Sequence, residues 1–236
     1  MRRATFWFIF GTVLLDMLAL GIIAPVFPKL VIQLEGGDDA SAASALGMLR
    51  ARGALLGLAF VAFLYRVAHD ALPSVFVLYG DYRFGWTART VGFALAIVGA
   101  ASIIVQAGLV GPAVRRLGEP RALLTGLACG ALAFVVYGLA PNGVVFLLGI
   151  APGSLYGLVY PSLQGLMTRR VGPDEQGQLQ GALGSLMGIA GVIAPVLFTQ
   201  VFAAAIGPFR GVGLPGAPFL LAALLLVVAM AAPGGS

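Results

Sequence analysis

Three ionisable side chains follow one another within an apolar stretch of this sequence. Arg66, His69 and Asp70 are spaced by three and four residues, which places them on one face of a helix. Arg66 and Asp70 can pair there and soften each other's insertion cost. The three residues could form a polar site that faces a cavity, with His69 or Asp70 titrating. A neutral structural pair, with His69 donating to a backbone carbonyl, is the alternative.

A fourth ionisable residue, Asp16, lies near the middle of another apolar stretch. An aspartate at the centre of a membrane costs about 2.5–3.5 kcal/mol to insert, so it usually marks a proton or ion site or a hydrogen bond to a neighbouring helix. Both interpretations fit Asp16. As a proton carrier it is a better candidate than Asp70, because Asp16 has no obvious partner in its own helix whereas Asp70 has Arg66 beside it.

Several further polar or aromatic side chains lie inside apolar stretches. Pockets for drug-like molecules are mostly apolar and hold a few placed polar groups, so these residues are candidates for the wall of a substrate cavity. Packing between helices is the alternative for each of them. The candidates are Tyr65, Gln106, Tyr156, Tyr160 and Gln164.

The composition is that of a membrane protein. Of the 236 residues, 60% are hydrophobic and 10% are charged, whereas soluble domains carry about 25% charged residues. The net charge of +5 does not indicate a nucleic-acid partner, because the basic residues fall between apolar stretches rather than in one stripe. Cys129 is the single cysteine, and no C-x-x-C or H-E-x-x-H motif occurs, so we expect no disulfide, metal site or cofactor.

A helix that crosses a membrane needs about 20 apolar residues. The sequence therefore predicts an all-α integral membrane protein of about seven transmembrane helices, joined by short charged connections such as Gly80–Arg83 and Arg115–Pro120. We expect an N-terminal transmembrane helix within 1–33, a linker at 34–53 and a six-helix part at 54–236. The predicted spans are 5–33, 54–79, 90–112, 121–140, 144–167, 179–206 and 217–233.

Arginines predict the orientation of the six-helix part, since cytoplasmic loops are enriched in them. If the span at 54–79 starts in the cytoplasm, seven loop arginines lie inside and three lie outside. Arg2 and Arg3 predict a cytoplasmic N-terminus, which would put the start of the 34–53 linker outside the cell. The arginines of the six-helix part put the end of the same linker inside. The linker cannot cross the membrane, so either one span is inverted or the first span does not fully insert.

Four stretches resemble the tetracycline-resistance-type drug:proton antiporters of the major facilitator superfamily. Residues 14–28 are similar to that family's first helix, with a membrane aspartate and a Pro-x-x-Pro. Residues 65–86 are similar to its seventh helix, 111–123 to the loop between helices eight and nine, and 169–181 to the entry to helix eleven. The resemblance implies half of a major-facilitator-type bundle plus one extra N-terminal helix, with helices two to six absent. An odd number of missing spans would produce the orientation conflict.

The resemblance also implies roles for particular positions. The cytoplasmic loop would act as a conformational latch through four charged residues: Arg115, Arg116, Glu119 and Arg121. The alternative is that these residues form a plain solvated loop. Tetracycline-specific members carry a histidine in helix eight and an aspartate in helix nine, where this sequence has Ser102 and Gly130, so tetracycline is not the expected substrate. Gly184, Gly188 and Gly191 form a Gly-x-x-x-Gly-x-x-Gly pattern that indicates close helix packing rather than a phosphate site.

The function that the resemblance implies is proton-coupled efflux of hydrophobic, drug-like compounds by a multi-pass protein of the inner (plasma) membrane, and not an enzyme. Its partners would be the lipid bilayer, a hydrophobic small-molecule substrate and protons. The alternative is a transport-inactive membrane subunit or internal-deletion fragment that associates with another chain, either a second copy or a full-length relative.

Overall fold

The computed structural model describes residues 53–232, which are almost entirely helical. The predicted first span and linker, and with them Asp16, lie outside the described residues, so the proposed division of the chain stays a prediction. The helices are α3 (Gly53–His69), α4 (Ala71–Phe84), α5 (Ala88–Ile104), α6 (Val110–Leu117), α7 (Glu119–Leu139), α8 (Gly143–Leu148), α9 (Ile150–Leu155), α10 (Val159–Thr168), α11 (Gln176–Ile206) and α12 (Ala217–Ala231).

These helices join into longer apolar stretches that confirm the all-α membrane class. Five of the stretches are long and apolar enough to cross a membrane: Gly53–Phe84, Ala88–Leu117, Glu119–Leu139, Gly143–Thr168 and Pro173–Ile206. The sixth, α12, has 15 residues. At about 1.5 Å per residue it is shorter than a bilayer core of about 30 Å, although the sequence predicted a longer span at 217–233.

Proline divides two of these stretches into shorter helices. Pro73 has no N–H to donate to the carbonyl of His69, and the chain turns at Asp70 between α3 and α4. Pro161 stands in the same way two residues into α10, directly after a 3₁₀ turn at Tyr156–Leu158. Pro73-Ser74 and Pro161-Ser162 thus occupy equivalent places in two broken spans, as expected for a repeated unit.

The predicted connection at Gly80–Arg83 is wrong. Helix α4 continues through it to Phe84, and the chain turns at Gly85, whose φ is 64°. Gly80 serves a different purpose, because a Cβ there would lie 2.6 Å from Cε3 of Trp86. The predicted connection at Arg115–Pro120 is also too long, since α6 runs to Leu117 and the turn is made at Gly118 with a φ of 75°.

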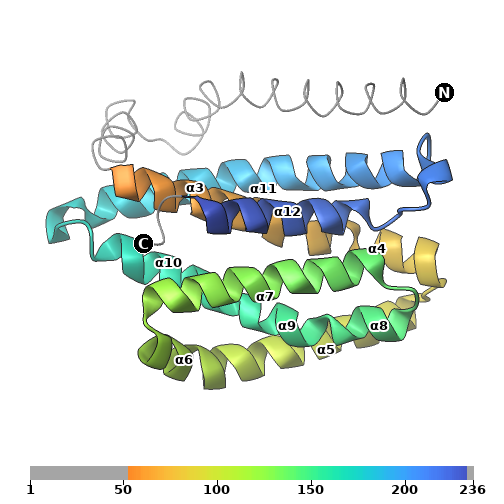
Figure 1. The fold of residues 1–236 in the computed structure, drawn as a ribbon, viewed down its shortest axis with the longest axis horizontal. Coiled ribbons are helices and arrows are strands. Elements are labelled where there is room, and N and C mark those ends of the chain that lie inside the picture. Colours follow the sequence, from red (N-terminus) through yellow and green to blue (C-terminus); the bar gives the residue numbers. More distant parts are fainter. Residues whose placement is uncertain (1–52, 233–236) are drawn as a thin grey trace. The chain divides into compact units, whose positions relative to one another are not determined.

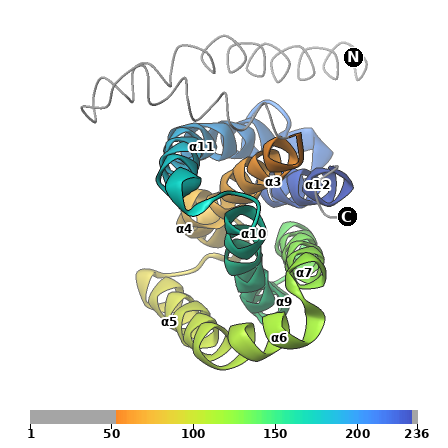
Figure 2. The same ribbon diagram turned by 90° about the vertical axis from the view of Figure 1, so that its left-hand side faces the viewer.

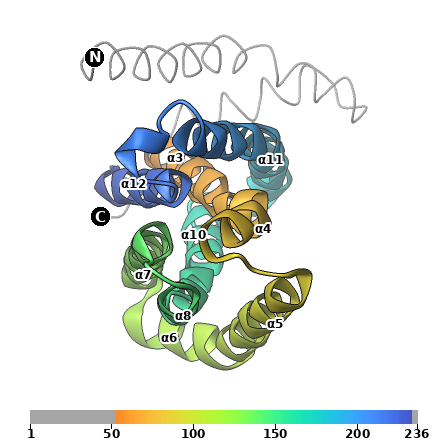
Figure 3. The same cartoon turned by 90° about the vertical axis from the view of Figure 1, so that its right-hand side faces the viewer.

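Two groups of helices form the bundle, as Figures 2 and 3 show: α3, α4, α11 and α12 lie on one side, and α5 to α10 lie on the other. The start of α3 and the α6–α7 and α10–α11 junctions lie at one end, and the α4–α5, α7–α8 and α11–α12 junctions lie at the other (Figure 1). Among the described residues, the first end carries five arginines and the second carries Arg83, Arg89 and Arg210. The arginines that were predicted to lie on opposite sides of the membrane therefore lie at opposite ends of the bundle.

Aromatic rings close the second end of the bundle. Phe146 of α8 packs against Tyr137 of α7, with ring centroids 4.5 Å apart, and against Trp86, at 5.6 Å. Phe219 of α12 meets Tyr79 of α4 at 5.0 Å, and the Tyr79 hydroxyl donates to the Tyr137 carbonyl at 3.1 Å. These contacts tie α4, α7, α8 and α12 together at one end.

Candidate functional site

A cavity of about 290 Å³ lies between the two groups of helices. Its walls come from α3 and α4 on one side and from α5, α7 and α9 on the other. Most lining side chains are apolar, and four aromatic rings are among them. The lining residues are His69, Leu72, Pro73, Phe76, Leu95, Val98, Ser102, Gly130, Ala133, Phe134, Tyr137, Ile150, Gly153, Ser154 and Tyr156.

Tyr65 forms an aromatic cluster with His69 and Tyr156. His69 and Tyr156 line the cavity, whereas Tyr65, which was predicted to line it, does not. The ring centroids of Tyr65 and Tyr156 are 4.9 Å apart, and each lies 5.9 Å from the imidazole of His69. The Tyr156 hydroxyl donates to the carbonyl of Tyr65 at 2.8 Å, which fixes the 3₁₀ turn against α3. Tyr156 is fully enclosed by protein apart from its cavity face, whereas His69 is exposed.

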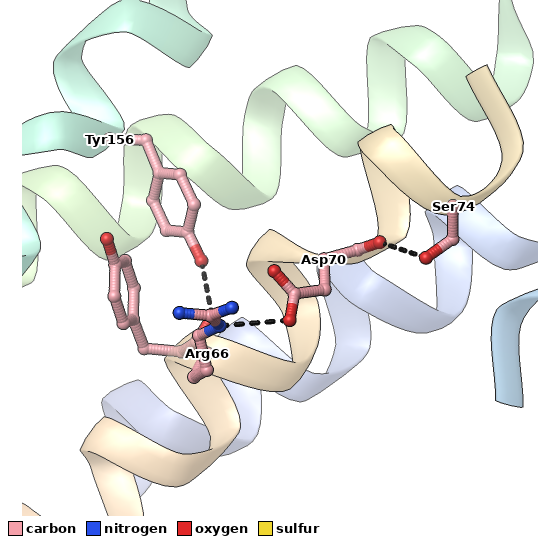
Figure 4. A network of polar contacts seen from close by, with 5 residues as sticks. Arg66, Asp70, Ser74 and Tyr156 are labelled. Carbon is pink, nitrogen blue, oxygen red and sulfur yellow. Dashed lines mark hydrogen bonds and ion pairs between the residues drawn. The ribbon is translucent and has the colours of Figure 1, made fainter. Parts of the chain in front are cut away.

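Arg66 and Asp70 pair across one turn of helix, as their spacing predicted. Nε of Arg66 lies 2.9 Å from Oδ2 of Asp70, and Ser74 Oγ donates to the Asp70 carbonyl at 2.5 Å (Figure 4). Asp70 is buried, and Arg66 is partly exposed beside Gly191 of α11. Neither charged side chain lines the cavity, so of the predicted triad only His69 faces it.

Tyrosines and glycines interlock the helices behind the cavity. A Cβ at Gly130 of α7 would collide with the ring of Tyr156, so this glycine makes room for the ring that reaches back to α3. In the opposite direction, Tyr137 of α7 lies over Gly149 and Gly153, where added Cβ atoms would come within 2.6 Å of its Cε1 and 3.0 Å of its hydroxyl oxygen. Small residues let the helix backbones approach closely.

The other predicted cavity residues lie elsewhere. Gln106 is exposed in a π-helical turn, Val105–Leu109, that joins α5 to α6. Gln164 of α10 exchanges amide hydrogen bonds of 3.2 and 3.3 Å with Gln180 of α11, and its Nε2 also donates to the Tyr160 hydroxyl at 2.8 Å. Tyr160, Gln164 and Gln180 therefore form an exposed polar cluster outside the cavity. Gln180 had no distinguishing sequence signal.

Ser102, Tyr137 and Ser154 are polar lining residues that were not predicted from the sequence. Ser102 attracted attention only as a departure from a family pattern. Tyr137 had a detectable signal, since Gly149 and Gly153 are one helical turn apart and leave space for a large side chain. Among residues 53–232, no group of three or more His, Cys, Asp or Glu side chains gathers to hold a metal ion.

The predicted latch lies at the arginine-rich end of the bundle. Glu119, at the start of α7, pairs with Arg169 at the end of α10, with 3.0 Å between Oε1 and Nη2. Its carboxylate lies against the bare backbone of Gly165, where a Cβ would collide with it. Arg115, Arg116 and Arg121 are exposed. Glu119 thus joins the α6–α7 and α10–α11 junctions, through an arginine that was not among the predicted latch residues.

Residues 3–195 match the family model described as Major Facilitator Superfamily. The chain belongs to this superfamily. It is a multi-pass protein of the inner membrane, as the family and the apolar helices both indicate.

Members of the superfamily similar to this chain include tetracycline resistance proteins. The class G protein of Vibrio anguillarum is 39% identical over 166 residues, which are 69% of this chain and 41% of that protein. The class C protein of Escherichia coli is 32% identical over 154 residues, 64% of this chain and 38% of that protein. Hippocampus abundant transcript-like protein 1 of Homo sapiens is 23% identical over 188 residues, 74% and 37% of the two chains. The matched part spans about two fifths of each curated relative.

Two positions named by the superfamily resemblance meet at the cavity. Ser102 and Gly130 stand where the resemblance implies a histidine and an aspartate, and both line the same space as His69. At Gly130 the structure gives a physical reason for the difference, because any side chain there would displace the Tyr156 ring. In this cavity, the Tyr156 ring therefore occupies the space beside Gly130.

Proposed function

We propose that this chain supplies the substrate-binding half of a proton-coupled efflux transporter for hydrophobic, drug-like compounds. The observation that carries the proposal is the cavity, which is mostly apolar with a few polar groups, the pattern of small-molecule pockets. The names of the relatives in classes C and G, tetracycline resistance proteins, support a drug as the substrate.

His69 and Asp16 are the proposed proton carriers. Asp70 is not proposed as a carrier, because it pairs with Arg66 at 2.9 Å and lies away from the cavity wall, so proton exchange at Asp70 would have to break that pair. His69 faces the cavity, and its side chain makes no hydrogen bond to the described residues. Asp16 is the second carrier on sequence grounds. We assign Arg66 and Asp70 a positioning role, because their pair holds the turn of α3 that presents His69.

The chain's association with another chain is the second part of the proposal. On α11, no atom lies within 4 Å of a Cβ added at Gly177, Gly181, Gly184 or Gly188, within the part of the chain that the structure describes. The four glycines recur every three or four residues and are exposed, so they present a bare helix face. The polar cluster of Tyr160, Gln164 and Gln180 lies at the same α10–α11 edge. Such a face is suited to a partner helix.

This open face also supports the alternative function. In the superfamily's inverted-repeat architecture, transport is the rocking of one half against another around a site between them. A chain that spans about two fifths of its relatives would then act as a membrane subunit that is inactive in transport until a second copy or a full-length relative completes it. Polar groups left facing lipid cost on the order of kilocalories each, which favours that association.

Transport in inverted membrane vesicles tests the drug-efflux function. We expect an imposed proton gradient to drive uptake of neutral hydrophobic drugs more effectively than uptake of tetracycline. Asp16→Asn and His69→Gln should each abolish the gradient dependence, and Val144→Ala, an exposed α8 position, is the control. Gradient-driven uptake that survives both substitutions would reject the proton-carrier assignment. A chain that is membrane-inserted yet shows no uptake would favour the inactive subunit.

A further inference from the structure

We infer that the cavity binds an uncharged molecule of two or three fused aromatic rings that carries one carbonyl or hydroxyl group. The inference rests on the proposed function for the assignment of this cavity as the substrate site, and it adds the chemical class of the substrate.

The lining side chains that make no hydrogen bond within the protein determine which polar groups a ligand needs. Five lining residues carry polar side chains, but the Tyr156 hydroxyl is used on the Tyr65 carbonyl and Ser154 Oγ donates to the Ile150 carbonyl at 2.8 Å. His69, Ser102 and Tyr137 have no side-chain hydrogen bond to any described residue. They stand on α3, α5 and α7, so three different walls offer hydrogen bonds to one ligand.

The described lining favours a neutral ligand. Among residues 53–232, no Asp, Glu, Lys or Arg lines the cavity, and Arg66 and Asp70 pair with each other at 2.9 Å. A charged ligand would leave water without a counter-ion, which costs far more than the burial of a neutral polar group. A single carbonyl or hydroxyl can instead be matched by the open groups of Ser102, Tyr137 or His69.

The walls favour fused aromatic rings. Phe76, Phe134, Tyr137 and Tyr156 present ring surfaces to the cavity, and aromatic rings stack on such surfaces with a gain beyond area burial. The volume of about 290 Å³ lies at the lower limit of ligand pockets, about 300 Å³, which favours two or three rings over a larger ring system.

An entry route lies on the outer side of the same wall. A second, open hollow of about 430 Å³ runs between α4 and α5, lined in part by Val77, Leu78 and Val91. Leu95 of α5 lines both this hollow and the cavity, so the two spaces adjoin at this side chain. Because the hollow is mostly apolar and opens on an exposed helix, the ligand can enter from lipid past Leu95.

Two probes of the same shape test the inference on the full chain in lipid nanodiscs. Acridone is a neutral tricycle with a carbonyl, and proflavine is a tricycle that is cationic at neutral pH. We expect acridone to bind saturably at one site per chain, measured by its fluorescence against protein-free nanodiscs, and proflavine to show no saturable binding. Equal affinity for proflavine would overturn the inference.

Three substitutions locate the site. Val98→Phe, on the loosely packed α5, should fill the cavity and abolish acridone binding. Tyr137→Phe and Ser102→Ala remove single hydroxyls and should each weaken binding about two- to tenfold, while Ser185→Ala should leave binding unchanged. Unaltered acridone affinity in monodisperse Val98→Phe protein would contradict the site. Since binding needs no gradient, acridone binding without drug flux would reject only the transport proposal.

Discussion

Helices α7 and α11 both carry repeated glycines, and the two helices use them in opposite ways. At Gly126, Gly130 and Gly138 of α7, an added Cβ would lie within about 3 Å of atoms in neighbouring helices. At Gly181 and Gly184 of α11, an added Cβ would meet nothing within 4 Å among the described residues. The first set is already occupied by packing, and the second has no packing contact among residues 53–232. A glycine pattern therefore predicts close approach without saying which molecule approaches.

The α7 side of the comparison carries the largest expected effect. Gly130→Val should force the Tyr156 ring out of its place and disturb Leu226 of α12, because a Cβ alone already overlaps both. Overpacking of this kind costs about 1–3 kcal/mol. We expect a clear fall in the melting temperature of the chain in detergent. Gly99→Val on α5, where a Cβ meets nothing, is the control, and equal losses for both variants would contradict the packing of α7.

The α11 side predicts an effect on association instead of stability. Gly184→Val should leave the melting temperature of the monomer unchanged but weaken self-association in bilayers by about tenfold, since a bulky side chain keeps a partner helix at a distance. Energy transfer between labelled copies in liposomes measures the association, with Gly99→Val again as the control. Undiminished association in Gly184→Val would show that the glycine face of α11 is not the contact.

A smaller change in the α7 region tests how the Tyr156 ring, which fills the space at Gly130, is held in place. Tyr156→Phe keeps the ring but removes the hydrogen bond to the Tyr65 carbonyl, which is 2.8 Å long. A net loss of about 0.5–1.5 kcal/mol is expected. It should appear as a modest drop in the melting temperature, smaller than that of Gly130→Val. A larger drop than Gly130→Val would mean that the hydrogen bond, and not the glycine contact, holds this region.

The smallest effect is expected where a glycine contact reaches the surface. Glu119, whose side chain is 14% exposed, lies against Gly165 and pairs with Arg169, whose side chain is 77% exposed, so the ion pair is open to solvent on the arginine side. Glu119→Gln should cost about 0.2–1 kcal/mol, and the loss should shrink in 1 M salt, where screening is strong. Asp81→Asn at the other end is the control. A salt-independent loss would indicate packing on Gly165 as the main contribution.

Much of the fold was predictable because it follows from local pattern. The long apolar runs predicted the helical stretches, and the spacing of Arg66 and Asp70 predicted their pair. The predicted helix boundaries were wrong where a glycine makes room for a side chain from elsewhere in the chain. The sequence predicts a turn at Gly80, whereas Gly80 lies inside α4 beneath the ring of Trp86. No local pattern reveals which distant ring will cover a glycine.

The site was predictable only in part for the same reason. His69 and Tyr156 were proposed from their polarity in apolar runs, and both line the cavity. Gln164 and Tyr160 gave the same signal, but α10 turns them toward Gln180 and away from the cavity. Which face of a helix points inward depends on the breaks at Gly149 and at the 3₁₀ turn Tyr156–Leu158, and each break rotates the residues that follow it.

Flux through single copies tests the central claim, that this chain holds a substrate cavity but needs a partner to transport. The purified chain is reconstituted in liposomes across a dilution series, from many copies per vesicle to fewer than one on average, and an imposed proton gradient drives uptake of acridone. We predict that vesicles with single copies show no gradient-dependent uptake, and that any uptake rises with the square of the copy number. Saturable, gradient-dependent uptake in proportion to single copies would contradict the claim and make the chain a complete transporter.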